Sequence, residues 1–132
     1  DYLLLHTSES GYVEMRLLLK ASDTLLCVNR TYLGSVADSE VRVYDTLWRF
    51  VAVVQRPDFA QFFKPSADDG QWQVEELDTL RMIRSEAETL PLMKASLSSV
   101  PNKVEWELQT AEFSKELKKV ASRYLQPVIC DL

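Results

Sequence analysis

Glycine and histidine are scarce in this 132-residue sequence, which has three glycines and one histidine. The glycines stand apart at positions 11, 34 and 70, so they cannot form a glycine-rich loop that binds phosphate. The histidine is His6, in an N-terminal stretch without a catalytic motif, which argues against Ser-His or Cys-His chemistry. We therefore expect a protein that is not an enzyme.

Cysteine is scarce as well, and the sequence contains only Cys27 and Cys130. They lie far apart and form no CxxC pair, so neither a disulfide framework nor a zinc site is indicated. A reducing compartment, the cytosol or the nucleus, is the default for such a chain. Acidic residues cluster at Asp68, Asp69, Glu75, Glu76 and Asp78, with a spacing that fits no calcium-binding loop. We expect no metal and no cofactor.

Long apolar runs and an excess of positive charge are also absent. No run approaches the roughly 18 apolar residues that span a membrane. The net charge of −5 argues against binding to nucleic acid or to anionic lipid, because both favour a basic surface. The length fits one globular domain, residues 1–132, with a core of its own. Because the chain starts with Asp1, we expect it to be a piece of a larger protein.

The stretch VEWELQTAEFSKELKKVASRYL, residues 104–125, changes its periodicity in the middle. Its first six residues alternate between apolar and polar, which is typical of a half-buried strand. Apolar residues then recur with helical spacing; they are Phe113, Leu117, Val120, Ala121 and Tyr124. Thr110 stands at the change and suits a helix N-cap, so we predict a strand over 103–109 and a helix over 111–126. A continuous helix from Asn102 is the alternative.

Alternating patterns predict further strands earlier in the chain. Val13, Met15, Leu17 and Leu19 alternate with mostly polar residues, and the turn SESG separates them from YLLLHT. A break at Ser22-Asp23 precedes TLLCVN, which is a third candidate strand. The turn VPNK would join MKASLSS to VEWELQ as a hairpin.

Two segments fit two kinds of structure. SEVRVYDTLWRFVAVVQ, residues 39–55, is interpreted as strands 40–45 and 48–55, although its apolar residues also fit one face of a helix. VEELDTLRMIRSEAETL, residues 74–90, is ambiguous in the same way. The low number of glycines also disfavours many tight turns. An all-α domain of short helices therefore remains the alternative to an antiparallel β domain.

Several strands followed by one amphipathic helix resemble the pleckstrin-homology-like superfold. The resemblance lies in LMKASLSSVPNKVEWELQTAEFSKELKKVASRYL, where a hairpin leads into the helix. It implies an α+β fold, a mostly antiparallel β sheet or bent barrel closed by a C-terminal amphipathic helix. Members that bind phosphoinositides use a basic cluster in the loop between the first two strands. The candidate loops SESG and ASDT contain no lysine or arginine, so we expect no binding to membrane lipid.

Two families of peptide readers are similar in smaller parts. The order of strands and helix is similar to that of a polo box, whose phosphopeptide site uses a His/Lys pair; His6 is the only histidine here. LWRFVAVVQRPDFAQFFKP resembles the first helix and following loop of a bromodomain, but the asparagine that would hold acetyl-lysine has no candidate after the later helix. A divergent polo-box-like or bromodomain-like peptide reader is thus an alternative function.

The segment RPDFAQFFKPSADDGQW concentrates aromatic residues outside any periodic pattern. They are Phe59, Phe62, Phe63 and Trp72. Aromatic residues of this kind are typical of protein interfaces, and we predict that these four bind a partner. In the alternative interpretation they pack down over an open edge of the fold. The predicted function is a non-enzymatic interaction or scaffold module, which binds a peptide or partner domain within a larger intracellular assembly.

Overall fold

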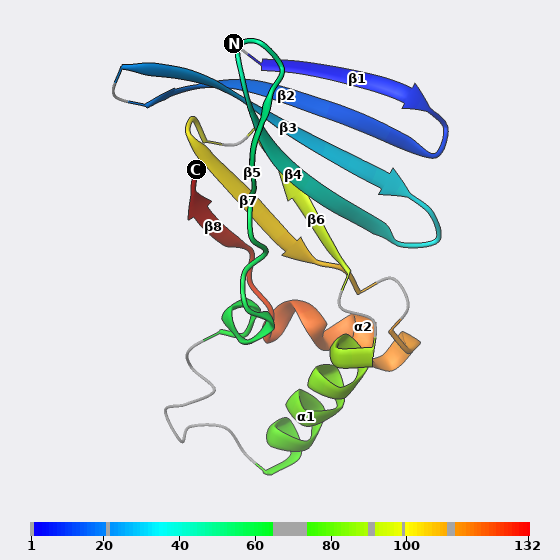
Figure 1. The fold of residues 1–132 in the computed structure, drawn as a ribbon. Helices are drawn as coiled ribbons and strands as arrows, with labels where there is room; N and C mark the ends of the chain where they lie inside the picture. Colours follow the sequence, from blue (N-terminus) through cyan, green and yellow to red (C-terminus); the bar gives the residue numbers. More distant parts are fainter. Residues whose placement is uncertain (1, 21, 65–73, 90–91, 99, 111–112) are drawn as a thin grey trace.

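The computed structural model describes residues 2–20, 22–64, 74–89, 92–98, 100–110 and 113–132, which form two antiparallel sheets and two α-helices (Figure 1). The first sheet has five strands in chain order: β1 Tyr2–Ser8, β2 Gly11–Lys20, β3 Asp23–Leu33, β4 Ala37–Asp45 and β5 Phe50–Val53. The second sheet has three: β6 Met93–Ser96, β7 Lys103–Leu108 and β8 Val128–Asp131. The helices are α1 Val74–Thr89 and α2 Lys115–Val120, and short 3-10 helices cover Phe59–Phe62 and Ala121–Arg123.

The five-stranded sheet is a meander of hairpins between long strands. β2 and β3 pair along ten consecutive residue pairs, from Gly11 opposite Tyr32 to Lys20 opposite Asp23. A side chain at Gly11 would place its Cβ 2.9 Å from the Thr31 carbonyl oxygen. Glycine at this position therefore allows the backbones of β2 and β3 to approach closely.

The three-stranded sheet is organised by the turn VPNK between β6 and β7. Asn102 has a φ of 59°, in the left-handed region that asparagine adopts more readily than most residues. The Lys103 N donates to the Val100 O at 3.3 Å and closes the turn. The Leu132 N donates to the Asn102 O at 3.0 Å, which ties the end of the chain beyond β8 to the same turn.

Polar side chains of the five-stranded sheet bind the free edge of β6. The Ala95 N donates to the Ser39 Oγ at 2.9 Å, and the Ala95 O accepts from the Asn29 Nδ2 at 2.8 Å. Ser39 and Asn29 are fully buried, and Ser39 also bonds Thr31 through the two hydroxyls at 2.7 Å. Buried backbone groups at a sheet edge need partners, and side chains of β3 and β4 supply them here.

The same arrangement continues at both ends of β6. The Met93 N donates to the Asp38 Oδ1 at 3.2 Å. The Leu97 N donates to the Glu14 Oε2 at 3.3 Å, and the Leu97 O accepts from the Arg16 guanidinium. The two sheets are thus joined by hydrogen bonds between side chains of one and the backbone edge of the other. We call the face of the five-stranded sheet that makes these bonds the inner face.

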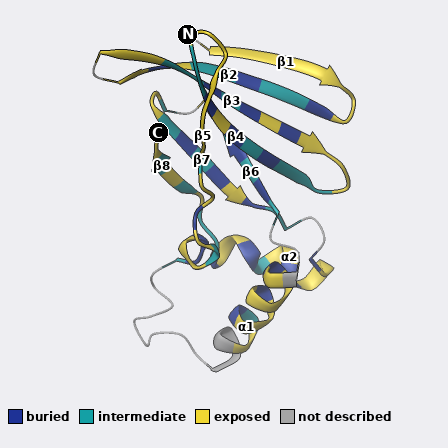
Figure 2. Cartoon of the chain, in the orientation of Figure 1, coloured by how far each residue is buried: buried dark blue, intermediate teal, exposed yellow. Residues whose placement is uncertain are grey.

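The apolar core lies between the three-stranded sheet, the helices and part of the inner face (Figure 2). Its largest fully buried apolar side chains are Trp106, Phe62, Leu18, Ile83, Leu97, Val41 and Val104. The predicted helical stripe is part of this core, since Phe113, Leu117, Ala121 and Tyr124 are all buried. Both helices lie at one end of the three-stranded sheet (Figure 1).

The predicted fold class, a sheet or bent barrel closed by a C-terminal helix, is wrong. The antiparallel sheets are present, but they stay open in the described residues and form no barrel. The C-terminal helix is short, and β8 follows it. The all-α alternative is also wrong, because strands outnumber helices throughout the described chain. The resemblance to the pleckstrin-homology-like superfold stays a prediction.

Individual elements were predicted with mixed success. The period change in residues 104–125 does mark a strand and then a helix, but α2 starts at Lys115 and its N-cap is Ser114, not Thr110. The Ser114 hydroxyl accepts from the Leu117 N at 3.4 Å, a local bond that periodicity does not reveal. Residues 39–55 do form two strands, and residues 74–89 form a helix. β8 was not predicted.

Candidate functional site

The face of the five-stranded sheet opposite the inner face is here called the outer face. Strand register assigns its members, because successive side chains of a strand point to opposite faces. Leu3, Met15 and Val28 form one row across the sheet, and Leu17, Leu26 and Tyr44 form another. The apolar and aromatic members are Leu3, Leu5, Val13, Met15, Leu17, Leu19, Leu26, Val28, Tyr32, Tyr44, Phe50 and Val53.

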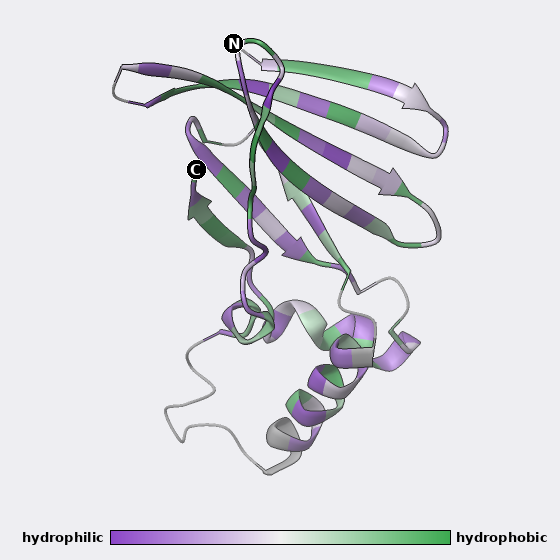
Figure 3. Ribbon diagram, in the orientation of Figure 1, coloured by the Kyte–Doolittle hydropathy of each residue, from purple (hydrophilic) through white to green (hydrophobic). Residues whose placement is uncertain are grey.

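The outer face is apolar and open to solvent. Exposed fractions include 42% for Leu17, 57% for Phe50 and 69% for Leu19. β1 is exposed along its whole length in Figure 2, and much of it is coloured hydrophobic in Figure 3. Contiguous apolar surface of this kind on a folded domain marks an interaction site. The outer face is therefore the strongest candidate for a functional surface.

The charged residues of the outer face lie on the neighbouring strands β3 and β4. Register places Arg30, Glu40 and Arg42 on this face. Arg42 and Glu40 form an ion pair with a nitrogen–oxygen distance of 2.9 Å, so they neutralise each other. The Arg42 guanidinium also lies 5.9 Å from the centre of the Phe50 ring. Arg42 lies opposite Val28 in the register, so these charges reach the middle of the face, whereas the part around Met15 and Leu26 contains none.

The turn between β4 and β5 holds a tryptophan at the border of the outer face. Asp45 organises this turn, because its Oδ1 accepts from the backbone N of Leu47 and of Arg49, both at 2.9 Å. The Arg49 Nε donates to the Asp45 Oδ2 at 2.7 Å. Within this frame Trp48 has a φ of 62°, which is strained for a bulky residue. Trp48 is 60% exposed.

Trp48 also closes a shallow groove on the sheet. The groove has a volume of about 350 Å³ and is lined by Tyr2, Leu3, Met15, Arg16, Leu17, Leu26 and Trp48. The Trp48 ring centre lies 6.1 Å from that of Tyr44. A strained, exposed aromatic side chain that borders an apolar groove has the features of an interface anchor.

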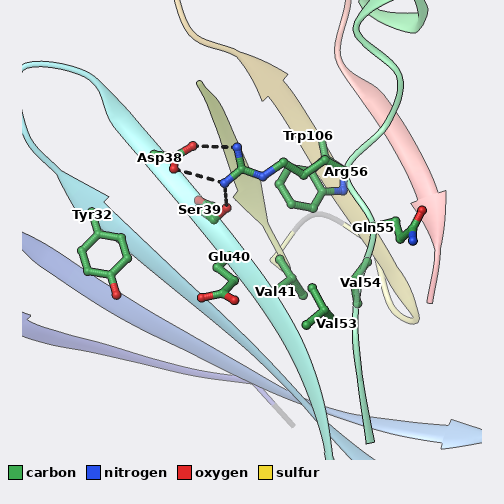
Figure 4. A pocket seen from close by; sticks show the side chains of 10 residues that line it. All are labelled: Tyr32, Asp38, Ser39, Glu40, Val41, Val53, Val54, Gln55, Arg56 and Trp106. Atoms are coloured by element: carbon green, nitrogen blue, oxygen red, sulfur yellow. Dashed lines mark hydrogen bonds and ion pairs between the residues drawn. The ribbon is translucent and has the colours of Figure 1, made fainter. Parts of the chain in front are cut away.

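A second candidate site is a pocket of about 440 Å³ at the edge of β4 (Figure 4). Arg56 lies at its centre, with Nη1 3.0 Å from the Asp38 Oδ1 and Nη2 donating to the Ser39 O at 2.6 Å. Behind it lies the indole of Trp106, whose ring centre is 6.0 Å from the guanidinium carbon. The other lining residues are Tyr32, Glu40, Val41, Val53, Val54 and Gln55.

The chemistry of this pocket is mainly structural. Arg56 is neutralised by Asp38 and completes the hydrogen bonding of the β4 edge beyond the end of β5. The buried Trp106 Nε1–H has no hydrogen-bond partner among the described residues. The arrangement can hold a small acceptor such as water, but Arg56 is not free to bind an anionic group. The pocket therefore ranks below the outer face.

Two side chains near the inner face, Tyr2 and Cys27, have strongly raised pKa values. Partial burial and the 2.6 Å hydrogen bond to Glu14 raise the pKa of the Tyr2 hydroxyl to about 12, from an ordinary 10.0. Burial, with a smaller contribution from Glu14, raises the pKa of the Cys27 thiol to about 12. Cys27 is thus a protonated thiol at neutral pH, which is the inert form. Burial also raises the pKa of Cys130.

The aromatic residues predicted to bind a partner lie in different environments. Phe62 and Phe63 are buried in the core, in keeping with the alternative interpretation of their segment. Phe59 is half-buried, with its ring centre 5.3 Å from that of Phe63. Trp72 lies outside the described residues. The structure therefore brings Phe59, Phe62 and Phe63 together as packing residues, and their role in binding stays a prediction.

The outer face was missed because its signal has two interpretations. The alternation of Val13, Met15 and Leu17 was recognised, but an apolar face of a strand ordinarily faces the core. Here the opposite side of β2, with Glu14 and Leu18, is the buried one. The predicted strand 48–55 includes the exposed pair Trp48 and Phe50, but its pattern does not indicate which side is covered.

The described residues contain neither a metal-binding cluster nor a membrane-spanning helix. No group of three or more His, Cys, Asp or Glu side chains there is arranged to hold a metal ion. No helix among them combines the length and apolar character needed to cross a membrane.

Comparison with known proteins gives a family and a fold relative. A family model described as "Protein of unknown function (DUF3256)" matches residues 1–130. A solved structure described as a domain of an uncharacterized protein from Porphyromonas gingivalis W83 has a TM-score of 0.75 and 27% sequence identity to this chain. The match covers 99% of this chain, which spans 66% of that solved chain. None of the curated proteins matches this chain.

Proposed function

The chain belongs to the DUF3256 family, and we propose that it is a protein-interaction module that docks its partner on the outer face. The observation that carries this proposal is the open apolar surface formed by alternate residues of β1, β2, β3 and β5. The role is one of binding, and it needs no catalytic group.

The composition of the outer face indicates what kind of surface fits it. Burying an unpaired charge in an interface costs free energy, so the charge-free part of the face around Met15 and Leu26 favours an apolar partner surface with few charges. Trp48, Tyr44 and Arg42 are residue types that often dominate binding energy in interfaces. They lie beside one another at the β4–β5 end of the face.

β1 extends the same surface to the edge of the sheet. It is an edge strand of seven residues, without a charged residue or a proline, the features that natural edge strands commonly use to prevent pairing. By contrast, the edge of β6 is occupied by side chains of the inner face. A partner on the outer face can therefore extend over the unprotected edge of β1, which adds to the surface available for docking.

The proposal is tested with a double variant, Leu17→Glu with Phe50→Glu. Both side chains are exposed, so the fold should be retained while two charges enter the proposed surface. Immobilised chain is incubated with extract of the source cells, and retained proteins are quantified by mass spectrometry. We expect retention of the partner to fall by roughly a hundredfold.

Met82→Glu provides the matched control. Met82 is 55% exposed on α1, away from the five-stranded sheet, and receives the same substitution at a single position. Retention by this variant should equal that of the wild type, and it should persist at about 1 M salt because an apolar interface is not screened. Equal retention by the double variant and the wild type would contradict the proposal.

A further inference from the structure

Building on the proposed function, we infer that the partner is a second copy of this chain, packed outer face against outer face. The two five-stranded sheets would then form the layers of a sandwich, with side chains of the two outer faces between them. Sheets that pack in this way lie about 10 Å apart, with strands inclined by roughly 30°.

The exposed area agrees with what a stable dimer needs. Seven well-exposed apolar residues on or beside the outer face are Leu3, Leu5, Leu17, Leu19, Trp48, Phe50 and Val53, at 42–69% exposure. They leave on the order of 700 Å² accessible, if an aromatic residue presents about 200 Å² and an aliphatic one somewhat less. A standard stable interface buries about 800 Å² on each partner. The half-buried members of the face, such as Met15 and Val28, supply much of the difference.

The distribution of charge permits self-association. The chain carries a net charge of −5, so two copies repel each other at long range. On the outer face, however, β1 has no charged residue, and Glu40 is paired with Arg42. Arg30 is directly opposite Glu40 in the register, so the charged part of the face on β3 and β4 contains both signs. Two such faces can therefore meet without burying like charges against each other.

The geometry also suits two-fold symmetry. In a symmetric dimer the same patch is used on both copies, so it must be complementary to itself. A largely apolar sheet face meets this condition, because its rows of aliphatic side chains can interdigitate with an identical set. The groove beside Trp48, lined by Met15, Leu17 and Leu26, gives the second copy a recess to fill.

Sedimentation velocity of the purified chain over a wide concentration range tests the inference. We expect a monomer–dimer equilibrium for the wild type and for Met82→Glu. Leu17→Glu with Phe50→Glu should raise the dimer dissociation constant by roughly a hundredfold or more, because two charges per copy enter the apolar layer. Far-ultraviolet circular dichroism and urea unfolding at low concentration confirm that the variants are folded.

Several outcomes would overturn the inference, and they separate it from the proposed function. A wild type that is monomeric at every concentration, or a double variant that dimerises like the wild type, rules out the outer-face dimer. So does growth beyond two copies without a dimer plateau. Suppose that the wild type is monomeric, and that the double variant fails to retain a protein that the wild type retains from the extract. The partner is then a different protein, and the proposal of an interaction module stands. If neither depends on the outer face, both proposals fail.

Discussion

The five-stranded sheet partly reverses the usual arrangement, because polar residues are buried on its inner face and apolar residues are exposed on its outer face. Outside the exposed strand β1, the inner face is covered. It holds apolar core residues such as Leu18 and also a polar network, in which Glu14 accepts from the Asn29 Nδ2 at 2.7 Å and from the Tyr2 hydroxyl at 2.6 Å. Glu14 is 3% exposed and Asn29 is fully buried. The outer face is apolar and open, with Leu17 and Leu19 on the same strand as Glu14.

This difference indicates that the sheet has two surfaces to bury. The polar inner face is satisfied within the chain, because its side chains are hydrogen-bonded to β6 and to one another. The outer face has the composition of a core layer without a facing layer. A second layer from outside the chain would give it the burial that its side chains favour.

Removing the polar network should have the largest effect on stability. Glu14→Leu leaves the buried Leu97 N and one Asn29 N–H without an acceptor, and each buried unsatisfied group costs about 1–3 kcal/mol. We expect the free energy of unfolding to fall by about 3 kcal/mol in urea denaturation. Glu14→Gln, which keeps one acceptor oxygen, should cost less.

The matching change on the opposite face of β2 sharpens the comparison. Leu17→Glu, measured below the dimer dissociation constant, should alter the free energy of unfolding by less than about 1 kcal/mol, because the side chain is already 42% exposed. If Leu17→Glu destabilised the monomer more than Glu14→Leu, the assignment of the two faces would be wrong.

Tyr2 links β1 to the polar network, and its effect should depend on pH. Its pKa is about 12 in the folded chain and 10.0 ordinarily, so the neutral hydroxyl is favoured by folding. Its contribution to stability is complete below pH 10 and is lost as pH rises toward 12. Because Tyr2 is 39% exposed, we expect a modest effect. Urea unfolding of the wild type and of Tyr2→Phe across this range measures it; parallel pH profiles would count against the Glu14 bond.

The smallest effect on stability is expected at Trp48. Glycine adopts a φ of 62° without strain, which offsets the lost contact with Tyr44 and the greater freedom of glycine in the unfolded chain. Trp48→Gly should therefore change the free energy of unfolding by less than about 1 kcal/mol while weakening dimerisation. A loss of several kcal/mol in urea unfolding would place Trp48 in the core instead.

Much of the strand structure could be predicted from local patterns. The alternation in β2 and in VEWELQ predicted strands correctly, and the turns SESG and VPNK were found by residue type. The exact start of α2 was not predicted, because it depends on one hydrogen bond, which the Ser114 hydroxyl accepts from the Leu117 N. β8 was missed because it has only four residues. It is stabilised by pairing with β7, a strand from an earlier part of the chain, and local sequence patterns do not reveal such a contact.

The sequence by itself determined which side chains of β2 share a face, because that follows from a period of two. It also identified apolar residues from Phe113 to Tyr124 that enter the core, although α2 covers only Lys115–Val120 of the predicted helix. Only the tertiary structure decided which face of the five-stranded sheet is buried. That choice depends on where β6 docks, and β6 docks on the polar face because its backbone edge needs the donors and acceptors of Glu14, Asn29 and Ser39.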